Sequence, residues 1–276
     1  MRKKSSIFLV GLILLLFPLF VGAEYAPFAI ISDTHIGLQE SVYIAFIQAV
    51  EAEKIQVIFH TGDAIHVPGD VMQWARFVQI TGQGKTVHLA AGNHDVSDKE
   101  SFAVFLKYFP EPYYSFSDGD TLFVILNTEL PGQKSRIAGE QLEWLKTDLQ
   151  RAFRYKFIFL HEPLFPVVRL HGLDIHKAAR DALHQLFVRT GVSLVIAGHD
   201  HLYERKMRDG VTYVIQGGGG GVMPFFMHNG DFHHYMLGRR ADDGYTFILK
   251  DMKGNVRDQF SITRQPLKGV YVETPQ

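Results

Sequence analysis

The residues best suited to chemistry in this sequence stand in short polar clusters, each directly after an apolar run. The clusters are Asp33-Thr34-His35, Gly62-Asp63, Gly92-Asn93-His94-Asp95, His161 and Gly198-His199-Asp200-His201. Their carboxylate, amide and imidazole groups offer oxygen and nitrogen donors, a mixture that suits Mn, Fe, Zn or similar divalent ions. The chain has no cysteine, which excludes thiolate catalysis and cysteine-ligated zinc.

Seven side chains in these clusters are candidate metal ligands: Asp33, His35, Asp63, Asn93, His161, His199 and His201. This set exceeds what one tetrahedral ion takes, whereas two ions that share a bridging carboxylate would use all of it. Such a pair can hold a hydroxide nucleophile and clamp both the attacking and the leaving oxygen of a phosphoryl displacement. The clusters therefore indicate a dinuclear centre with two divalent ions, Mn, Fe, Zn or Co, as cofactors.

The elements that must position these clusters alternate along the chain from Phe28 onward. The runs FAIIS, VIFHT, VHLAA, FIFL and LVIA predict buried strands, and segments between them such as QESVYIAFIQAVEAE show helical spacing. This alternation predicts an α/β layered domain. In open α/β sheets, sites form outside the carboxyl ends of the strands, so the clusters are expected at one edge.

The C-terminal part of the chain has a different pattern. The runs VTYVIQ, YMLGRRA, GYTFILKD and VRDQFSI predict antiparallel strands separated by glycine or charged turns. No linker composition separates them from the preceding segments. We therefore expect one domain over residues 24–276.

The N-terminal residues have the composition of a targeting segment. The basic MRKK is followed by an apolar stretch that ends in VGA, a small-residue cleavage pattern. We expect residues 1–23 to be a cleaved signal peptide and the protein to be exported, to the periplasm or the medium. The alternative is an uncleaved membrane anchor, which would bring membrane contact.

The charge of the chain bears on its partners. The full sequence has a formal net charge of −1, and the leader carries Arg2, Lys3 and Lys4 but no acid. The mature chain is therefore mildly acidic, which argues against nucleic-acid binding, since that requires a basic face. An exported chain without cysteine also has no disulfides to stabilise it.

Taken in order, the DTH, GD, GNHD, H and GHDH blocks resemble those of the calcineurin-like metallophosphoesterases. That superfamily includes purple acid phosphatases and cyclic-nucleotide phosphodiesterases. The blocks extend from Asp33 to His201, and the antiparallel tail resembles the second sheet of the family. The resemblance implies a four-layer α/β/β/α sandwich of two mixed β-sheets, with the site at the C-terminal ends of the strands.

The resemblance also implies how the ligands divide between two ions. One ion would be bound by Asp33, His35 and His201. The other ion would be bound by Asn93, His161 and His199, with Asp63 as the bridge.

Two neighbours of Asn93 would serve catalysis. His94 would face the substrate, where it would stabilise the phosphoryl oxygens or protonate the leaving oxygen. Asp95 would orient the imidazole of His94. The alternative for Asp95 is a helix N-cap, and the two roles are compatible.

The implied activity is that of a dinuclear metal-dependent phosphoric ester hydrolase. A metal-bridging hydroxide would attack the ester, because metal binding brings the pKa of water towards neutral. The expected partner is a small-molecule phosphate ester, and the expected activity is that of a phosphatase on small phosphorylated compounds. The alternatives are a phosphodiesterase, acting on a cyclic nucleotide or a lipid-linked phosphate, and a non-catalytic scaffold of the same fold.

Several other residues stand outside the five blocks. No tyrosine stands just after Asp63, so we do not expect the tyrosinate-bound iron of purple acid phosphatases. His66 is either at the substrate mouth or a solvated loop residue. The cluster His228, His233 and His234 is a third-metal site, a substrate-side loop or an ordinary surface loop. The remaining histidines, His60, His88, His171, His176 and His184, show no ligand spacing and are interpreted as structural.

Overall fold

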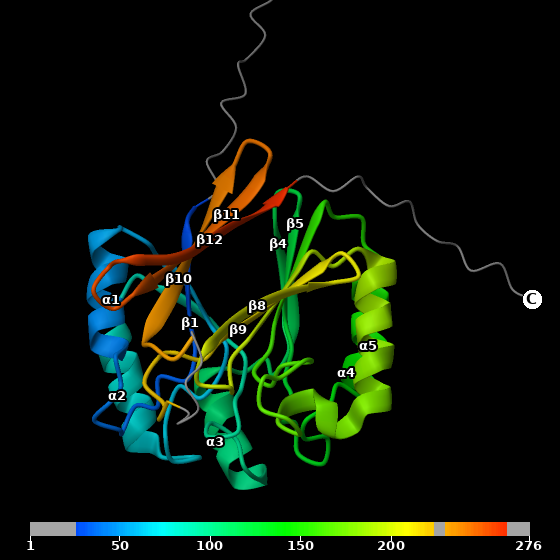
Figure 1. Cartoon of the computed structure of the whole chain (residues 1–276). Helices are drawn as coiled ribbons and strands as arrows, with labels where there is room; N and C mark the ends of the chain where they lie inside the picture. Colours follow the sequence, from blue (N-terminus) through cyan, green and yellow to red (C-terminus); the bar gives the residue numbers. More distant parts are fainter. Residues whose placement is uncertain (1–25, 224–229, 264–276) are drawn as a thin grey trace, which may run out of the picture.

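The computed structural model describes residues 26–223 and 230–263, and two six-stranded sheets form its centre (Figure 1). The first sheet has the strand order β12-β11-β10-β1-β2-β3. Its strands are β1 (Phe28–Ile31), β2 (Val57–His60), β3 (Thr86–Leu89), β10 (His234–Ala241), β11 (Gly244–Asp251) and β12 (Val256–Thr263). Strands β1, β2 and β3 are parallel, and β10 joins β1 antiparallel.

The second sheet has the order β4-β5-β6-β7-β9-β8. Its strands are β4 (Tyr114–Asp118), β5 (Thr121–Ile125), β6 (Tyr155–Phe159), β7 (Leu194–Ala197), β8 (Tyr203–Arg208) and β9 (Val211–Gln216). Strands β5, β6, β7 and β9 are parallel, whereas β4 and β8 pair antiparallel at the two edges. Both sheets are therefore mixed.

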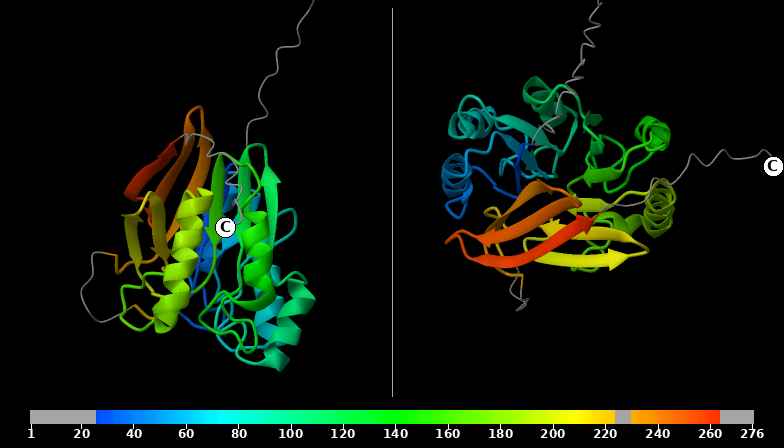
Figure 2. Two further views of the ribbon diagram at one scale, coloured as in Figure 1. Left: turned by 90° about the vertical axis from the view of Figure 1, so that its right-hand side faces the viewer. Right: turned by 90° about the horizontal axis from the view of Figure 1, so that it is seen from above.

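The helices cover the outer faces of the two sheets (Figures 1 and 2). The elements are α1 (Tyr43–Ala52), α2 (Val71–Thr81), α3 (Lys99–Tyr108), α4 (Gly139–Asp148), the 3-10 helix η1 (Gly172–His176) and α5 (Lys177–Thr190). Apolar residues of α1, α2 and α3 pack on the first sheet, and those of α4 and α5 pack on the second. The predicted four-layer α/β/β/α sandwich is confirmed.

The alternation of side chains along each strand builds separate apolar layers. In β1, Ala29 and Ile31 face the helices, whereas Phe28 and Ile30 face the second sheet. Aromatic rings fill the layer between the sheets, where Phe59 of β2 stacks on Phe159 of β6 with centroids 4.1 Å apart. Burial of each such ring contributes about 1.5–3 kcal/mol. The central layer therefore fixes the two sheets against each other.

The C-terminal strands depart from the purely antiparallel prediction. Strand β9 pairs parallel to β7 and belongs to the second sheet, while β10, β11 and β12 extend the first sheet. The edge strands β8 and β12 lie side by side (Figure 2), joined by Arg205 Nε and Asp258 Oδ2 at 2.7 Å. Parallel pairing of β9 requires the chain to return after β7, and the β8–β9 hairpin makes that return.

The predicted leader, residues 1–23, lies outside the described residues. Within residues 26–223 and 230–263, no helix is both long and apolar enough to span a bilayer.

Candidate metal centre

All five strands that precede the polar clusters end at one edge of the sandwich. Strands β1, β2 and β3 run parallel in the first sheet, and β6 and β7 run parallel in the second, so each pair of neighbours ends together. The sheets also meet there, because His161 Nδ1 donates to the carbonyl of Thr61 at 2.9 Å. The predicted placement of the clusters at the carboxyl ends of the strands is observed.

A first group of donors combines three side chains of the first sheet with one of the second. The ligand atoms of Asp33, His35, Asp63 and His201 all lie within 4.8 Å of one another. His35 Nε2 is 3.3 Å from His201 Nε2 and 3.7 Å from Asp63 Oδ2, and His201 Nε2 is 3.5 Å from Asp33 Oδ1. These residues form one candidate ion site.

A second group of donors converges on His161. Its Nε2 atom lies 3.0 Å from Asn93 Oδ1, 3.2 Å from His199 Nδ1 and 3.5 Å from Asp63 Oδ1. Asp63 thus turns one carboxylate oxygen towards each group. Each of the seven side chains proposed as ligands lies in one or both of these two groups.

The donor set fits divalent ions. In both groups two imidazole nitrogens face each other, at 3.3 Å for His35 and His201 and 3.2 Å for His161 and His199. Nitrogen ligands of one tetrahedral ion, each at about 2.0–2.1 Å from it, lie about 3.4 Å apart. Each facing pair is also accompanied by carboxylate or amide oxygen, as a hard or borderline divalent ion requires.

Burial controls the electrostatics of the donors. Burial and the charge of Asp33 raise the pKa of Asp63 to about 7, because ionising two neighbouring carboxylates in a buried site costs free energy. For Asp33, burial acts to raise the pKa, but its hydrogen bond to His201 and nearby histidine charges outweigh burial and lower it. Burial also lowers the pKa of His35 to about 3. That imidazole is therefore neutral at pH 7 and has a lone pair for an ion.

The main chain at the centre is held in unusual conformations. Asp33, His35, Asp63 and His199 have φ values of 56°, 43°, 54° and 70°, in the left-handed region that non-glycine residues rarely adopt. Strain of this kind costs of order 1–3 kcal/mol per residue and gathers at functional sites.

Glycine allows close approach at one of these turns. A Cβ atom on Gly92 would overlap both the carboxylate and the main-chain nitrogen of Asp63. The glycine before Asn93 is therefore needed for the third cluster to pack against the second.

His94 lies beside the centre and is held through its Nδ1 atom. Nδ1 donates to the main-chain carbonyl of His66 at 2.6 Å, and the main-chain N–H of His94 donates to Asp63 Oδ1 at 2.8 Å. The ring meets His35 edge-on, with centroids 4.7 Å apart. Because a carbonyl oxygen can only accept, Nδ1 carries a proton and Nε2 is the nitrogen that can exchange one.

Asp95 has a different partner from the one expected. Its Oδ1 atom accepts from the amides of Ala64 and Ile65 at 2.9 and 3.2 Å, and Oδ2 accepts from the amide of Gly92 at 2.9 Å. The carboxylate therefore fixes the turn that carries Asp63, and the carbonyl of His66 orients His94 instead.

The alternative interpretation of Asp95 also differs from the structure. The N-cap of α3 is Asp98, whose Oδ1 atom accepts from the amide of Ser101 at 2.8 Å. Asp95 lies three residues too early to cap that helix, and its oxygens bind the turns after β2 and β3 instead.

His171 lies at the centre although no spacing in the sequence identifies it. Its ring stacks on His199 with centroids 3.8 Å apart, and its Nδ1 atom is 2.6 Å from Asp200 Oδ1. Asp200 is buried and also accepts from the amides of Val167 and Val168. The hydrogen bond to Asp200 raises the pKa of His171, whose side chain is 40% exposed. The sequence did offer one indication of a further site residue. Asp200 stands between the proposed ligands His199 and His201, and its carboxylate binds His171.

The other histidines make structural contacts. His60 Nε2 is 3.0 Å from Thr34 Oγ1, His88 Nδ1 is 2.9 Å from Tyr114 Oη, and His184 Nδ1 is 2.7 Å from Tyr213 Oη. His233 and His234 bind the main-chain carbonyls of Gly218 and Phe232 through Nδ1. His228 lies outside the described residues. In the described part of the chain, neither His233 nor His234 belongs to a group of converging metal ligands.

Similar sequences carry phosphatase names. Over 172 residues the chain is 28% identical to purple acid phosphatase 15 of Arabidopsis thaliana, covering 53% of this chain and 32% of that protein. Over 128 residues it is 34% identical to serine/threonine-protein phosphatase CPPED1 of Bos taurus, covering 41% and 40%. The chain thus spans well under two thirds of either relative.

Solved structures share the fold. Purple acid phosphatase PPD1 of yellow lupin matches with a TM-score of 0.71 and 20% identity, over 87% of this chain and 54% of that one. A dimetal phosphatase from Danio rerio matches with a TM-score of 0.61 and 16% identity, over 88% and 100%. GAP50, named as the anchor in the inner membrane complex of Plasmodium, matches with a TM-score of 0.70 and 14% identity, over 88% and 90%.

The family model described as calcineurin-like phosphoesterase matches residues 26–203, a range that contains all five clusters and every residue of the two donor groups. With the sandwich and the converging donors, this match means that the chain belongs to the calcineurin-like phosphoesterase family.

Proposed function

We propose that this protein is a phosphatase that hydrolyses small phosphate esters at a dinuclear centre of divalent ions. The observation that carries the proposal is the position of Asp63 between the two donor groups. Its Oδ2 atom faces His35 at 3.7 Å and its Oδ1 atom faces His161 at 3.5 Å. A carboxylate with one oxygen towards each group is suited to bridging two ions.

The ions and the side chains have separate tasks in this proposal. When bound, two divalent ions supply Lewis-acid activation of the phosphoryl group and lower the pKa of water towards neutral. The protein holds the donors: Asp33, His35 and His201 on one side of Asp63, and Asn93, His161 and His199 on the other. No side-chain nucleophile is required, so we expect no covalent phospho-enzyme.

His94 is the proposed general acid. Its Nδ1–H is fixed by the carbonyl of His66 at 2.6 Å, which leaves Nε2 to donate a proton to the leaving oxygen. His171 is the proposed cationic contact for the phosphoryl oxygens, because its bond to Asp200 favours the charged imidazolium. Asp95 contributes indirectly, because its carboxylate fixes the turn that carries Asp63.

The phosphatase names of the similar sequences support a monoester substrate. A non-catalytic scaffold is the competing proposal, because the chain also resembles a protein named as an anchor. The complete donor set favours catalysis, since a scaffold has no need to keep every donor in place.

The test uses protein stripped with a chelator and reloaded in turn with Mn, Fe, Zn or Co. Substrates are p-nitrophenyl phosphate, bis-p-nitrophenyl phosphate and a phosphoserine peptide. Metal-restored turnover of the monoester supports the proposal, whereas turnover of the diester alone indicates a phosphodiesterase. Turnover of the peptide alone indicates a protein phosphatase. Binding of fewer than two ions, or no turnover with two ions bound, contradicts the proposal.

We also propose that residues 1–23 are a signal peptide and that the protein is exported to the periplasm or the medium. The basic start, the apolar stretch and the small residues before Glu24 support this. N-terminal sequencing of the protein recovered from cells and medium tests it. A start at Glu24 is expected, whereas an intact leader in the membrane fraction would indicate an anchor.

A further inference from the structure

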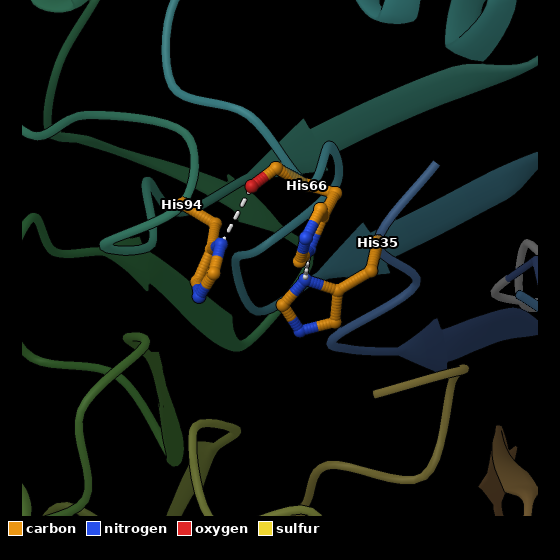
Figure 3. Close-up of side chains that lie close together, drawn as sticks. All are labelled: His35, His66 and His94. Carbon is orange, nitrogen blue, oxygen red and sulfur yellow. Dashed lines mark hydrogen bonds between the residues drawn. The ribbon is translucent and has the colours of Figure 1, made fainter. Parts of the chain in front are cut away.

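His66 lies against two residues of the centre, His35 and His94 (Figure 3). Its ring Nδ1 atom is 3.5 Å from His35 Nδ1, and its main-chain carbonyl accepts from His94 Nδ1 at 2.6 Å. The rings of His66 and His94 are stacked, with centroids 5.1 Å apart and planes inclined by 21°. One residue therefore contacts a proposed ligand through its ring and the proposed acid through both its ring and its main chain.

The position of the proton on His35 decides which ring donates and which accepts in the contact between His35 and His66. His35 Nε2 faces the first donor group, at 3.3 Å from His201 Nε2 and 3.7 Å from Asp63 Oδ2. A neutral imidazole that offers Nε2 to an ion carries its proton on Nδ1. This N–H points at His66 Nδ1, which must accept it. At 3.5 Å the contact is longer than the usual range of about 2.7–3.2 Å, so the hydrogen bond is a weak one.

The three rings also satisfy the distances of a metal site, since ligand atoms of His35, His66 and His94 lie within 4.8 Å of one another. Two nitrogens in this trio already carry protons, however. His94 Nδ1 faces a carbonyl oxygen, which only accepts, and His35 Nδ1 is protonated when Nε2 binds an ion. A hydrogen-bonded trio therefore explains the contacts better than a third ion.

The main chain of His66 is itself anchored. The amides of His66 and Val67 both donate to Gln73 Oε1 of α2, at 2.9 and 3.0 Å, and the amide of His66 also donates to the carbonyl of Ile36 at 3.1 Å. This anchoring fixes the carbonyl that receives the proton of His94. The loop after Asp63 is thus built to present both a ring acceptor and a carbonyl acceptor.

We propose that His66 is a positioning residue that orients His35 through its ring and His94 through its carbonyl. The proposal rests on the proposed function, because it assumes that His35 binds an ion. Partners that orient metal-bound histidines typically change metal affinity about 10–100-fold when removed. His66 has this relationship to His35, and its main-chain contact with His94 does not depend on the side chain.

Two substitutions separate the acceptor from the bulk of the ring. His66→Phe keeps an aromatic ring against His94 but removes the acceptor, and His66→Asn restores an oxygen acceptor near the position of Nδ1. The measurement is titration of chelator-stripped protein with Zn or Co against a competing metal dye. His176→Phe and His176→Asn, in the 3-10 helix η1, are the matched controls. Thermal unfolding of the metal-free variants checks that each one folds.

The expected result is a loss of metal affinity of about tenfold or more in His66→Phe, and recovery to within about threefold in His66→Asn. Wild-type affinity in a folded His66→Phe would overturn the proposal. Equal loss in both variants would also overturn it, because bulk and not the acceptor would then matter. Binding of three ions by the wild-type chain and of two by His66→Phe would overturn it as well, because the three histidines would then be a metal site.

This experiment separates the proposal from the proposed function. If the wild-type protein binds two ions but cleaves no phosphate ester, the phosphatase proposal fails. The metal affinities of the two His66 variants still decide whether His66 orients a ligand.

Discussion

The ring of His171 lies flat on the ring of His199, with centroids 3.8 Å apart and planes inclined by 18°. His171 is partly exposed, and its hydrogen bond to Asp200 raises its pKa, so a side chain whose charged form is favoured covers a proposed ligand. Stacking and charge are separable contributions of this residue. The first prediction separates them.

His171→Phe should keep the stack and lose the charge. We expect metal content to stay at the wild-type value and kcat/KM for a phosphomonoester to fall about tenfold, mainly through KM, which corresponds to about 1.4 kcal/mol. His171→Ala removes both contributions. Any additional loss of metal in that variant measures the contribution of ring stacking to metal binding. An unchanged KM in His171→Phe would contradict the role of the charge.

His94→Ala should retain both ions, because the side chain is not among the proposed ligands. We expect kcat to fall about 10²–10⁴-fold, the usual range for loss of a general acid. The loss should be larger for an alkyl phosphate than for p-nitrophenyl phosphate, because the alkoxide needs the proton more. Equal losses on both substrates would argue against proton donation, and loss of the ions would argue for a ligand.

Asp63→Asn should lower metal affinity and raise the stability of the metal-free protein. The change keeps the shape of a buried side chain. It removes the repulsion between the carboxylates of residue 63 and Asp33. Metal analysis and thermal unfolding in chelator measure the two effects. Such opposite changes are expected where a strained site serves function. Full occupancy by two ions would show that Asp63 is not the bridge.

Gly92→Ala should disrupt the centre through a single methyl group. The added Cβ would overlap Asp63, so we expect weaker metal binding and a stability loss of about 1–3 kcal/mol. Gly132→Ala is the control, because its Cβ would meet open space although its φ is +81°. If both variants bind metal equally well, close approach at Gly92 is unimportant.

His88 should make the metal-free protein sensitive to acid. Its ring lies on Phe116 at 4.2 Å, and burial lowers its pKa to about 4 from an unfolded value near 6.5. The folded state therefore resists protonation, so stability is full above pH 6.5 and is lost as pH falls towards 4. His88→Phe should reduce this loss by about 3 kcal/mol in denaturant unfolding at pH 4 against pH 7. Parallel pH curves for both proteins would contradict it.

The convergence of the candidate ligands could be predicted because its signal is local in the sequence. Each donor follows a short apolar run, and parallel strands end at a common edge of the sheet. The meeting of the five turns can therefore be predicted without knowing any side-chain contact. The alternation of strands and helices predicted an α/β layered domain, whereas the four-layer sandwich was implied by the resemblance to the family. The apolar pattern did not predict the parallel pairing of β9, because apolar alternation is the same for parallel and antiparallel neighbours.

The contacts of Asp95 and His171 could not be predicted for a different reason. Asp95 is adjacent to His94 in sequence, but its carboxylate turns back to the amides of Ala64 and Ile65, which are about thirty positions away. His171 follows β6 in a segment of turns, where no periodicity indicates direction. Which way a side chain points in an irregular segment depends on tertiary packing, and the sequence carries no repeating signal for it.

Each donor group takes residues from both sheets, and this has a mechanical consequence. Asp33, His35, Asp63 and Asn93 follow strands of the first sheet, whereas His161, His199 and His201 follow strands of the second. An ion held by either group would connect the two sheets at the edge opposite the turn between β10 and β11 (Figure 1). Loading the centre with metal should therefore slow amide hydrogen exchange in β1 and β7 together. Removing the metal with a chelator should speed exchange first at that edge, where the two sheets would separate locally.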